Sequence, residues 1–471
     1  MVPQRNAQRG RAPTPGRPVV PGWVLTIEAE PADGREASAV VREASARGAP
    51  VGPAPAGPGP VRDERATALV RLVSLVLVVL VALRLPGPAG VPLGTFAAIG
   101  LAPVVVPAAR RFVGGPLLLV TITLSLVAGW WLSAWSAMDH ARSERLAIEW
   151  TFHLVGLALG VAALLWARTV WSDAQVALFF GVGMVLGVAS GGVGGSNPWK
   201  FALSIPVSVL VLAVAALVGR WWVECLALGA LAAVSMLNDS RSLFGMFLMA
   251  GALVAWQGWM RRPSRGADRK RSALAHLLLL AVLGSGVFAL GQSLMLEGAL
   301  GEAAQQRSVE QIERSGNLLV GARPEMGAAF ALAAERPAGF GLGVRLTLEE
   351  ILVAKSGMAK LGYDPNNGYV ERYMFGGAVE VHSVAGDLWA LTGVVGLVLA
   401  AVVTGLLLRA VGVGLAGRSA SALLLLLCLR GLWDMFFGPL YSGLAIYTLV
   451  LGLALARRPG RASTAASAWL K

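Results

Sequence analysis

Three polar side chains lie beside long apolar segments, where a charged or titratable group is costly. Arg241 opens the apolar run SRSLFGMFLMAG, Arg323 precedes the segment RPEMGAAFALAAERPAGFGLG, and His382 lies shortly before an apolar run. A guanidinium near a helix N-terminus suits an anionic group such as a phosphate. A neutral imidazole suits the removal of a proton from a hydroxyl group. Together these residues predict anion binding and general-base chemistry at a membrane surface.

Each of the three also has an ordinary structural explanation. Arg241 can extend from a helix end to the membrane interface, and Arg323 can be a solvated residue on a loop helix. His382 can be an interfacial histidine that bonds a backbone carbonyl. In favour of a site, Glu380 lies two residues before His382, at a spacing that would let its carboxylate orient the ring.

Composition indicates the class of protein that holds these residues. The chain has 471 residues, of which 56% are hydrophobic and only 14% charged, whereas a soluble protein carries roughly a quarter charged residues. Apolar runs of about 20 residues recur, as in helical membrane proteins. The net charge of +13 comes from arginines in the short gaps between these runs, which favours topology signals over nucleic-acid binding. Cys225 and Cys428 both lie in apolar segments and fit no disulfide framework or metal-ligand spacing.

The predicted fold is therefore an all-α polytopic membrane protein with about 12 transmembrane helices. The predicted spans are 66–85, 92–109, 114–135, 148–167, 175–192, 201–219, 222–237, 242–260, 273–293, 385–408, 418–437 and 440–456. The predicted division of the chain is a disordered cytoplasmic tail (1–64), transmembrane helices 1–9 (65–293), a partly helical extracytoplasmic loop (294–384), transmembrane helices 10–12 (385–456) and a cytoplasmic tail (457–471).

The distribution of basic residues predicts the orientation. With the N-terminus in the cytoplasm, every cytoplasmic connection carries a basic residue, and the densest cluster, RRPSRGADRKR at 261–271, is cytoplasmic too. Both termini are then cytoplasmic, and the long loop between helices 9 and 10 faces outward. A connection of this length in a bundle of short loops is usually functional or disordered.

At these three motifs the chain resembles the O-antigen ligase and polymerase family. SRSLFGMFLMAG is similar to its "SRG then apolar helix" signature, RPEMGAAFALAAERPAGFGLG to its periplasmic "Arg, amphipathic helix, Pro, Gly-x-Gly" segment, and VEVHSVAGDLWALTGVVG to its "His-Asn, then helix" segment. The order of the motifs and the position of the long loop also match the ligase layout. The chain departs from the family at Ser242, where Gly is common, and at Ser383, where Asn is common.

The resemblance implies a membrane glycosyltransferase of the GT-C type that uses no metal and no cofactor. Such enzymes move a glycan from a polyprenyl-diphosphate carrier to the hydroxyl of a glycan or glycolipid acceptor, on the outer face of the cytoplasmic membrane. Carried over by motif, Arg241 and Arg323 bind the lipid diphosphate and His382 is the catalytic base. Direct attack assisted by one base would invert the anomeric centre. Supporting candidates are Glu380, Ser383, Asp387 and Lys200.

Two alternatives remain open on the sequence. A polysaccharide polymerase of the same superfamily would perform the same transfer with a lipid-linked repeat unit as acceptor. A multi-span transporter, from a different class, also commonly has 12 spans, although carriers more often show two similar halves. Among other polar residues, Arg430 and Asp434 are four residues apart in a predicted span, which favours a structural ion pair. His140 and His153 have no partners that the sequence identifies.

Overall fold

The computed structural model describes residues 61–192, 197–260, 268–298, 302–315, 323–377 and 379–458. Within these ranges the chain is helical, with isolated β-bridges in place of named strands. The predicted tails therefore lie almost wholly outside the described residues. The helices are α2 (Val61–Leu83), η2 (Pro88–Gly90), α3 (Leu93–Gly100), α4 (Ala102–Ala108), η3 (Ala109–Arg111), α5 (Gly115–Ser136), α6 (Glu144–Ala167), α7 (Asp173–Gly191), η4 (Trp199–Leu203), α8 (Ser204–Val218), α9 (Trp221–Leu237), α10 (Arg241–Trp259), α11 (Asp268–Leu296), α12 (Glu302–Ser315), α14 (Glu325–Glu335), α15 (Leu348–Ala359), η5 (Val370–Met374), α16 (Val384–Gly417), α17 (Ala422–Phe437) and α18 (Leu440–Ala454).

The structure supports a polytopic α-helical membrane protein. Among the described residues, seven helices are long and apolar enough to cross a membrane, and an eighth span results if the bent pair α3 and α4 is counted as one. Helices α9 and α18 are apolar but shorter. The total of twelve spans therefore stays a prediction. The same holds for the orientation of the termini and the identity of the membrane.

Of the predicted spans, 92–109 shows a clear difference from the structure, because it is not one continuous helix. It is broken at Leu101, and its two halves, α3 and α4, meet at an angle of 82°. Pro103 follows the break, and proline lacks the N–H that would continue the helical hydrogen-bond ladder. A second break lies inside α16, where Gly393 adopts φ 64° and ψ −148°.

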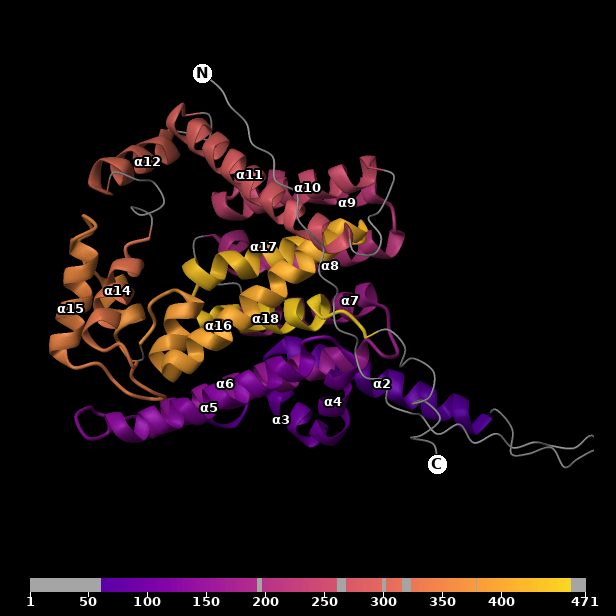
Figure 1. Ribbon diagram of the computed structural model, residues 1–471, viewed down its shortest axis with the longest axis horizontal. Coiled ribbons are helices and arrows are strands. Elements are labelled where there is room, and N and C mark those ends of the chain that lie inside the picture. The colour runs from indigo at the N-terminus through magenta and orange to yellow at the C-terminus, as the bar shows by residue number, and fades with distance from the viewer. Residues whose placement is uncertain are drawn as a thin grey trace, which may run out of the picture. The chain divides into compact units, whose positions relative to one another are not determined.

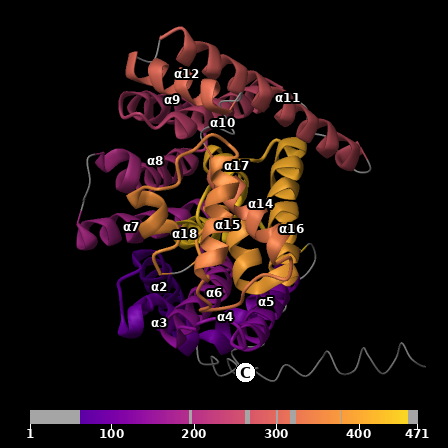
Figure 2. The same ribbon diagram turned by 90° about the vertical axis from the view of Figure 1, so that its left-hand side faces the viewer.

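Helices α6, α16 and α18 occupy the centre of the bundle. α6 packs against α3, α4, α5 and α18, while α16 packs against α5, α11, α17 and α18. Their contact surfaces contain fully buried leucines and valines such as Leu164, Leu407 and Val450. At one end of the bundle lie α14 and α15 (Figure 1), and Figure 2 views the bundle from that end.

Residues 323–383, apart from the undescribed position 378, form what we call the loop domain. It has its own hydrophobic core, which includes Leu332 from α14, Met358 from α15 and Val370 from η5. Helices α14 and α15 cross closely at two glycines, because a Cβ on Gly327 would lie 2.3 Å from the carbonyl oxygen of Gly357. The loop domain is thus an ordered unit that includes two of the three motifs.

The segment 339–343, which we call the glycine strap, attaches the loop domain to the bundle. Its backbone donates hydrogen bonds from Phe340 and Gly341 to the Ala390 carbonyl of α16, at 2.9 and 3.0 Å. The backbone N–H of Leu342 donates to the Gly129 carbonyl of α5 at 3.1 Å. The strap therefore runs between α5 and α16.

Only glycine fits at the alternate positions of the strap. Gly339, Gly341 and Gly343 have φ values of 84°, 108° and 74°, a region that L side chains rarely adopt. A Cβ on Gly341 would also lie 2.3 Å from the backbone nitrogen of Ser133. Residues 339–344 are all buried.

We expect Gly341→Ala to destabilise the protein by at least about 2 kcal/mol, through left-handed backbone strain and steric overlap with α5. The measurement is the midpoint of thermal unfolding of the detergent-solubilised chain. Gly405→Ala is the matched control, because Gly405 lies inside α16 with nothing within 4 Å of its added Cβ. An unchanged midpoint for Gly341→Ala would show that the strap is not under this constraint.

Candidate functional site

The backbone holds His382 in a defined and unusual conformation. Its φ is 52°, a left-handed value that few residues other than glycine adopt. The residue before it, Val381, donates its N–H to Asp387 Oδ1 at 2.8 Å. The residue after it, Ser383, caps α16 and donates its hydroxyl to the Met435 carbonyl at 3.0 Å. Fixed neighbours on both sides therefore set the direction of the His382 side chain.

Around the imidazole ring lie Tyr369 and Glu325, both from the loop domain. The Tyr369 ring meets the His382 ring edge-on, with 5.3 Å between centroids. The Tyr369 hydroxyl donates to Glu325 Oε1 at 2.6 Å. His382 Nδ1 and Glu325 Oε2 are buried, and each lacks a hydrogen-bond partner among the described residues. A buried polar atom without a partner is costly unless a ligand or water satisfies it.

The protonation of this cluster follows from its burial. Burial lowers the pKa of His382 below its usual value, and the negative charge of Glu325 acts in the opposite direction. Burial also raises the pKa of the Tyr369 phenol, with the charge of Glu325 adding to the effect. At neutral pH the imidazole is therefore neutral and able to accept a proton, while Tyr369 stays protonated and donates to Glu325.

Arg323 lies at the same cluster. Its guanidinium stands 5.7 Å from the ring centroid of Trp433 and 5.8 Å from that of Phe437, both on α17. Its positive charge acts on both His382 and Tyr369. No carboxylate of the described residues forms an ion pair with it, so aromatic faces rather than an acid support this arginine. The structure therefore brings two of the three predicted site residues together.

Arg241 belongs to a second group, on the turn between α9 and α10. It is the first residue of α10, as predicted, and its Nε lies 3.3 Å from Asp239 Oδ1. Lys200 on η4 approaches the other oxygen of the same carboxylate at 3.6 Å. Two hydrogen bonds, from Asn197 to the Asn238 carbonyl and from Trp199 to Ser235, hold η4 against this turn. Lys200 and Arg241 thus lie close together, on the two oxygens of one carboxylate.

Arg241 forms an ion pair with Asp239, on the turn before α10. The convergence of Arg241, Arg323 and His382 on one cavity stays a prediction. Among the supporting candidates, Asp387 has a structural position. Asp387 is 1% exposed, and its second oxygen accepts the Leu440 N–H at 2.8 Å, so it joins α16 to the start of α18.

The Glu380 backbone forms a hydrogen bond with His382, and a role of its carboxylate in orienting the ring stays a prediction. Its carboxyl group is buried near Glu149, and burial followed by that like charge raises the pKa of Glu380. The charge of another carboxylate, Glu325, acts on His382 from 57 positions earlier in the chain. Sequence reasoning missed Glu325 and Tyr369; the available signal was the position of Glu325 directly after the Arg-Pro motif, in the first turn of α14.

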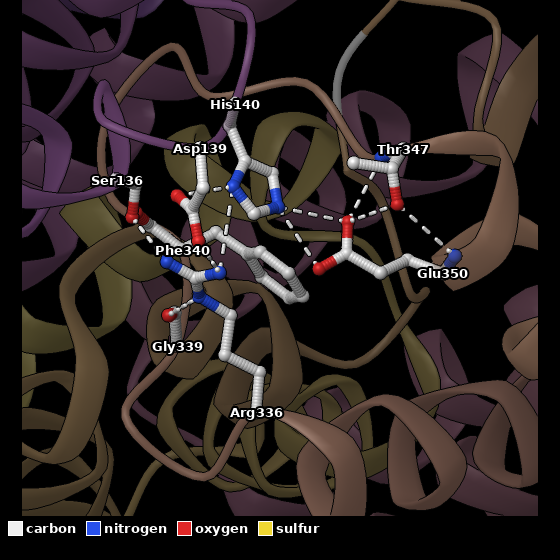
Figure 3. A network of polar contacts seen from close by, with 8 residues as sticks. All are labelled: Ser136, Asp139, His140, Arg336, Gly339, Phe340, Thr347 and Glu350. Carbon is white, nitrogen blue, oxygen red and sulfur yellow. Dashed lines mark hydrogen bonds and ion pairs between the residues drawn. The ribbon is translucent and has the colours of Figure 1, made fainter.

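His140, for which the sequence gave no partners, lies in a polar network between α5 and the loop domain (Figure 3). Its Nδ1 lies 2.7 Å from Asp139 Oδ1, and its Nε2 lies 2.9 Å from both oxygens of Glu350 on α15. Arg336, at the end of α14, donates to Asp139 at 3.1 Å and to Ser136 at 3.0 Å. Both ring nitrogens face carboxylates, so this histidine fastens the loop domain and is not available to a substrate.

The ion pair predicted in α17 is confirmed, since Arg430 Nε lies 2.7 Å from Asp434 Oδ2, while its position within a membrane stays a prediction. His153, the other histidine without a predicted partner, has Glu149 Oε1 at 3.6 Å from its Nε2. Among the described residues, no group of three His, Cys, Asp or Glu side chains converges as the ligands of a metal would.

We expect the His140 network to stabilise the fold in a pH-dependent way. Hydrogen bonds from Arg336 and then His140 lower the pKa of Asp139 from 3.8 to about 2. A depressed carboxyl pKa stabilises the folded state above pH 3.8, and this contribution is lost as the pH falls from 3.8 through 2. The midpoint of thermal unfolding should thus be lower for Asp139→Asn than for wild type at pH 6, and the two should converge in acid. Equal midpoints at pH 6 would contradict this role of Asp139.

The chain matches no family model, no curated protein and no solved structure. The resemblance to the O-antigen ligase family therefore depends on the three short motifs and their order along the chain.

Proposed function

We propose that this protein is an O-antigen ligase-like glycosyltransferase, which moves a glycan from a polyprenyl-diphosphate carrier to an acceptor hydroxyl at the outer face of the cytoplasmic membrane. The observation that carries the proposal is the cluster of Arg323, Glu325, Tyr369 and His382. It combines an arginine free of carboxylate partners among the described residues with a neutral histidine whose Nδ1 is unpaired. These are the two groups that a sugar–diphosphate transfer requires.

In the proposed reaction the acceptor hydroxyl oxygen attacks the anomeric carbon of the donor sugar. Its proton passes to the unpaired Nδ1 of His382, and the nearby Glu325 carboxylate stabilises the resulting imidazolium. The bond between the anomeric carbon and the phosphate oxygen breaks, and its electron pair stays on the leaving lipid diphosphate. Arg323 stabilises this growing negative charge more in the transition state than in the ground state.

Arg241 and Lys200 are the second cationic group that we assign to the diphosphate. Both lie on one carboxylate, Asp239, so together the three side chains carry one net positive charge.

A single displacement of this kind inverts the anomeric configuration. A product linkage with retained configuration would rule out the mechanism.

The acceptor decides between a ligase and a polymerase. A ligase transfers to a distinct glycan or glycolipid, whereas a polymerase of the same superfamily transfers to a second lipid-linked repeat unit. Both reactions release free lipid diphosphate, so its release from a lipid-linked donor is the common assay. Incubation with each acceptor in turn then distinguishes the two.

We expect His382→Ala to lower the rate of lipid diphosphate release by about a hundredfold or more, because a general base is lost. Glu325→Gln should lower it by about tenfold or more, through loss of the charge that stabilises the imidazolium. Glu349→Gln, an exposed glutamate in the first turn of α15, is the matched control and should leave the rate unchanged. Full activity of His382→Ala, with normal membrane insertion, would refute the assigned base.

The pH profile gives an independent check. Because burial lowers the pKa of His382, the acid limb of the pH–rate profile should have its midpoint below pH 6.5. Protonation removes the base as the pH falls through that value. Glu325 raises the pKa of His382, so Glu325→Gln should move the limb to still lower pH. A wild-type midpoint at or above 6.5, or a shift in the other direction, would contradict this pairing.

A further inference from the structure

A small cavity of about 40 Å³ lies where α2 ends, between α2, α3, α6 and α18. This volume can hold a few water molecules or a small polar group. Most of the lining is apolar, for example Val81, Leu157 and Leu444, but two basic side chains, Arg84 and His153, also line it. The cavity is separate from the cluster of Arg323 and His382, none of whose residues line it.

Arg84 is a half-buried arginine that lacks an acidic partner. Its guanidinium stands 5.5 Å from the ring centroid of Tyr441, and its hydrogen bond is a long one of 3.4 Å to the Tyr441 carbonyl. No carboxylate of the described residues pairs with it. Arg168 shows the contrast, because it bonds both oxygens of Asp173 and two backbone carbonyls. The donors of Arg84 are therefore largely unused by the residues that the structure describes.

His153 offers a second unused group at the same cavity. It is 4% exposed, and its Nε2 is buried without a hydrogen-bond partner among the described residues. The nearest carboxylate oxygen, Glu149 Oε1, is 3.6 Å away, beyond hydrogen-bond distance. Trp150 and Tyr441 pack edge-on against the ring and fix its orientation. A buried polar atom of this kind is costly unless a water molecule or ligand satisfies it, and His153 is one of the residues that line the cavity.

The broken helix beside the cavity fits a binding role. Thr95 and Pro92, at the start of α3, line the cavity, and α3 and α4 meet at 82°. Irregular backbone at membrane depth is tolerated where it is buried in protein or lines a polar cavity. Phe96 on α3 is 39% exposed, and its ring lies against that of Phe152 in the cavity wall in a tilted arrangement, with 5.9 Å between centroids. An apolar chain can therefore lie beside the cavity while a polar group enters it.

We propose that this cavity binds a phosphate group, through the guanidinium of Arg84 and the Nε2 of His153. A phosphate oxygen accepts hydrogen bonds from both groups, and an arginine fork matches its geometry. The phosphate can belong to a lipid headgroup, with its acyl chains along α3, or to free inorganic phosphate. The site is independent of the proposed glycosyl transfer, since it shares no residue with it.

The test is native mass spectrometry of the full chain in detergent, with dioleoyl phosphatidic acid as the probe and dioleoylglycerol, which lacks the phosphate, as its comparison. We expect the wild type to retain phosphatidic acid at least about tenfold more tightly than dioleoylglycerol. Arg84→Gln should remove about tenfold of that affinity, and Arg84→Lys less, because the charge remains. Inorganic phosphate in excess should displace the lipid if free phosphate fits, and should not if the site requires the lipid.

Two further variants keep the result interpretable. Gly156→Val fills the cavity without changing any charge, because a Cβ on Gly156 already lies 2.8 Å from Thr95 Oγ1, and it should weaken binding as Arg84→Gln does. Arg142→Gln is the control, because Arg142 also stands over an aromatic ring, Trp130 at 4.9 Å, but does not line the cavity. Equal retention of the two lipids, or wild-type binding by folded Arg84→Gln and Gly156→Val, would overturn the proposal.

Discussion

The hydrogen bonds between the glycine strap and the two helices around it are the constraint on which the rest of the structure depends. A helix buried in a membrane protein must pair each backbone group internally, because the surroundings offer no water. At Gly393, α16 leaves the helical conformation, and the Ala390 carbonyl accepts from Phe340 and Gly341 instead. The strap therefore supplies the donors for a carbonyl at the break in the helix.

The strap also determines where the chemical groups lie. It follows α14, which begins two residues after Arg323, and α16 begins directly after His382 and Ser383. Trp389 of α16 donates its ring N–H to the Pro337 carbonyl at 2.9 Å, which adds a second attachment between the same segments. The distance between Arg323 and His382 is thus set by backbone bonds on both sides of the site. The His140 network fastens the far side of the loop domain through α15.

The sequence predicted the parts of this arrangement that local pattern controls. The start of α10 at Arg241 and the ion pair in α17 both follow from helical periodicity and from the residue types at the helix start. The break at Leu101 had a local signal too, in the proline that follows it. Contacts such as that of His140 with Glu350, 210 positions apart, leave no local pattern. The role of Glu325 could not be predicted for the same reason, because only the folded chain brings it to His382.

The two cationic groups differ in how readily each can accept a phosphate. Arg241 and Lys200 already share Asp239, so an incoming anion must compete with a carboxylate for their donors. Arg323 is supported by the faces of Trp433 and Phe437, and no carboxylate of the described residues forms an ion pair with it. An anion must therefore weaken an ion pair at Arg241, whereas at Arg323 no such pair among the described residues competes with it. In the proposed reaction, this difference favours Arg323 for the phosphate on which negative charge grows, beside the base, and leaves Arg241 to orient the remainder of the diphosphate.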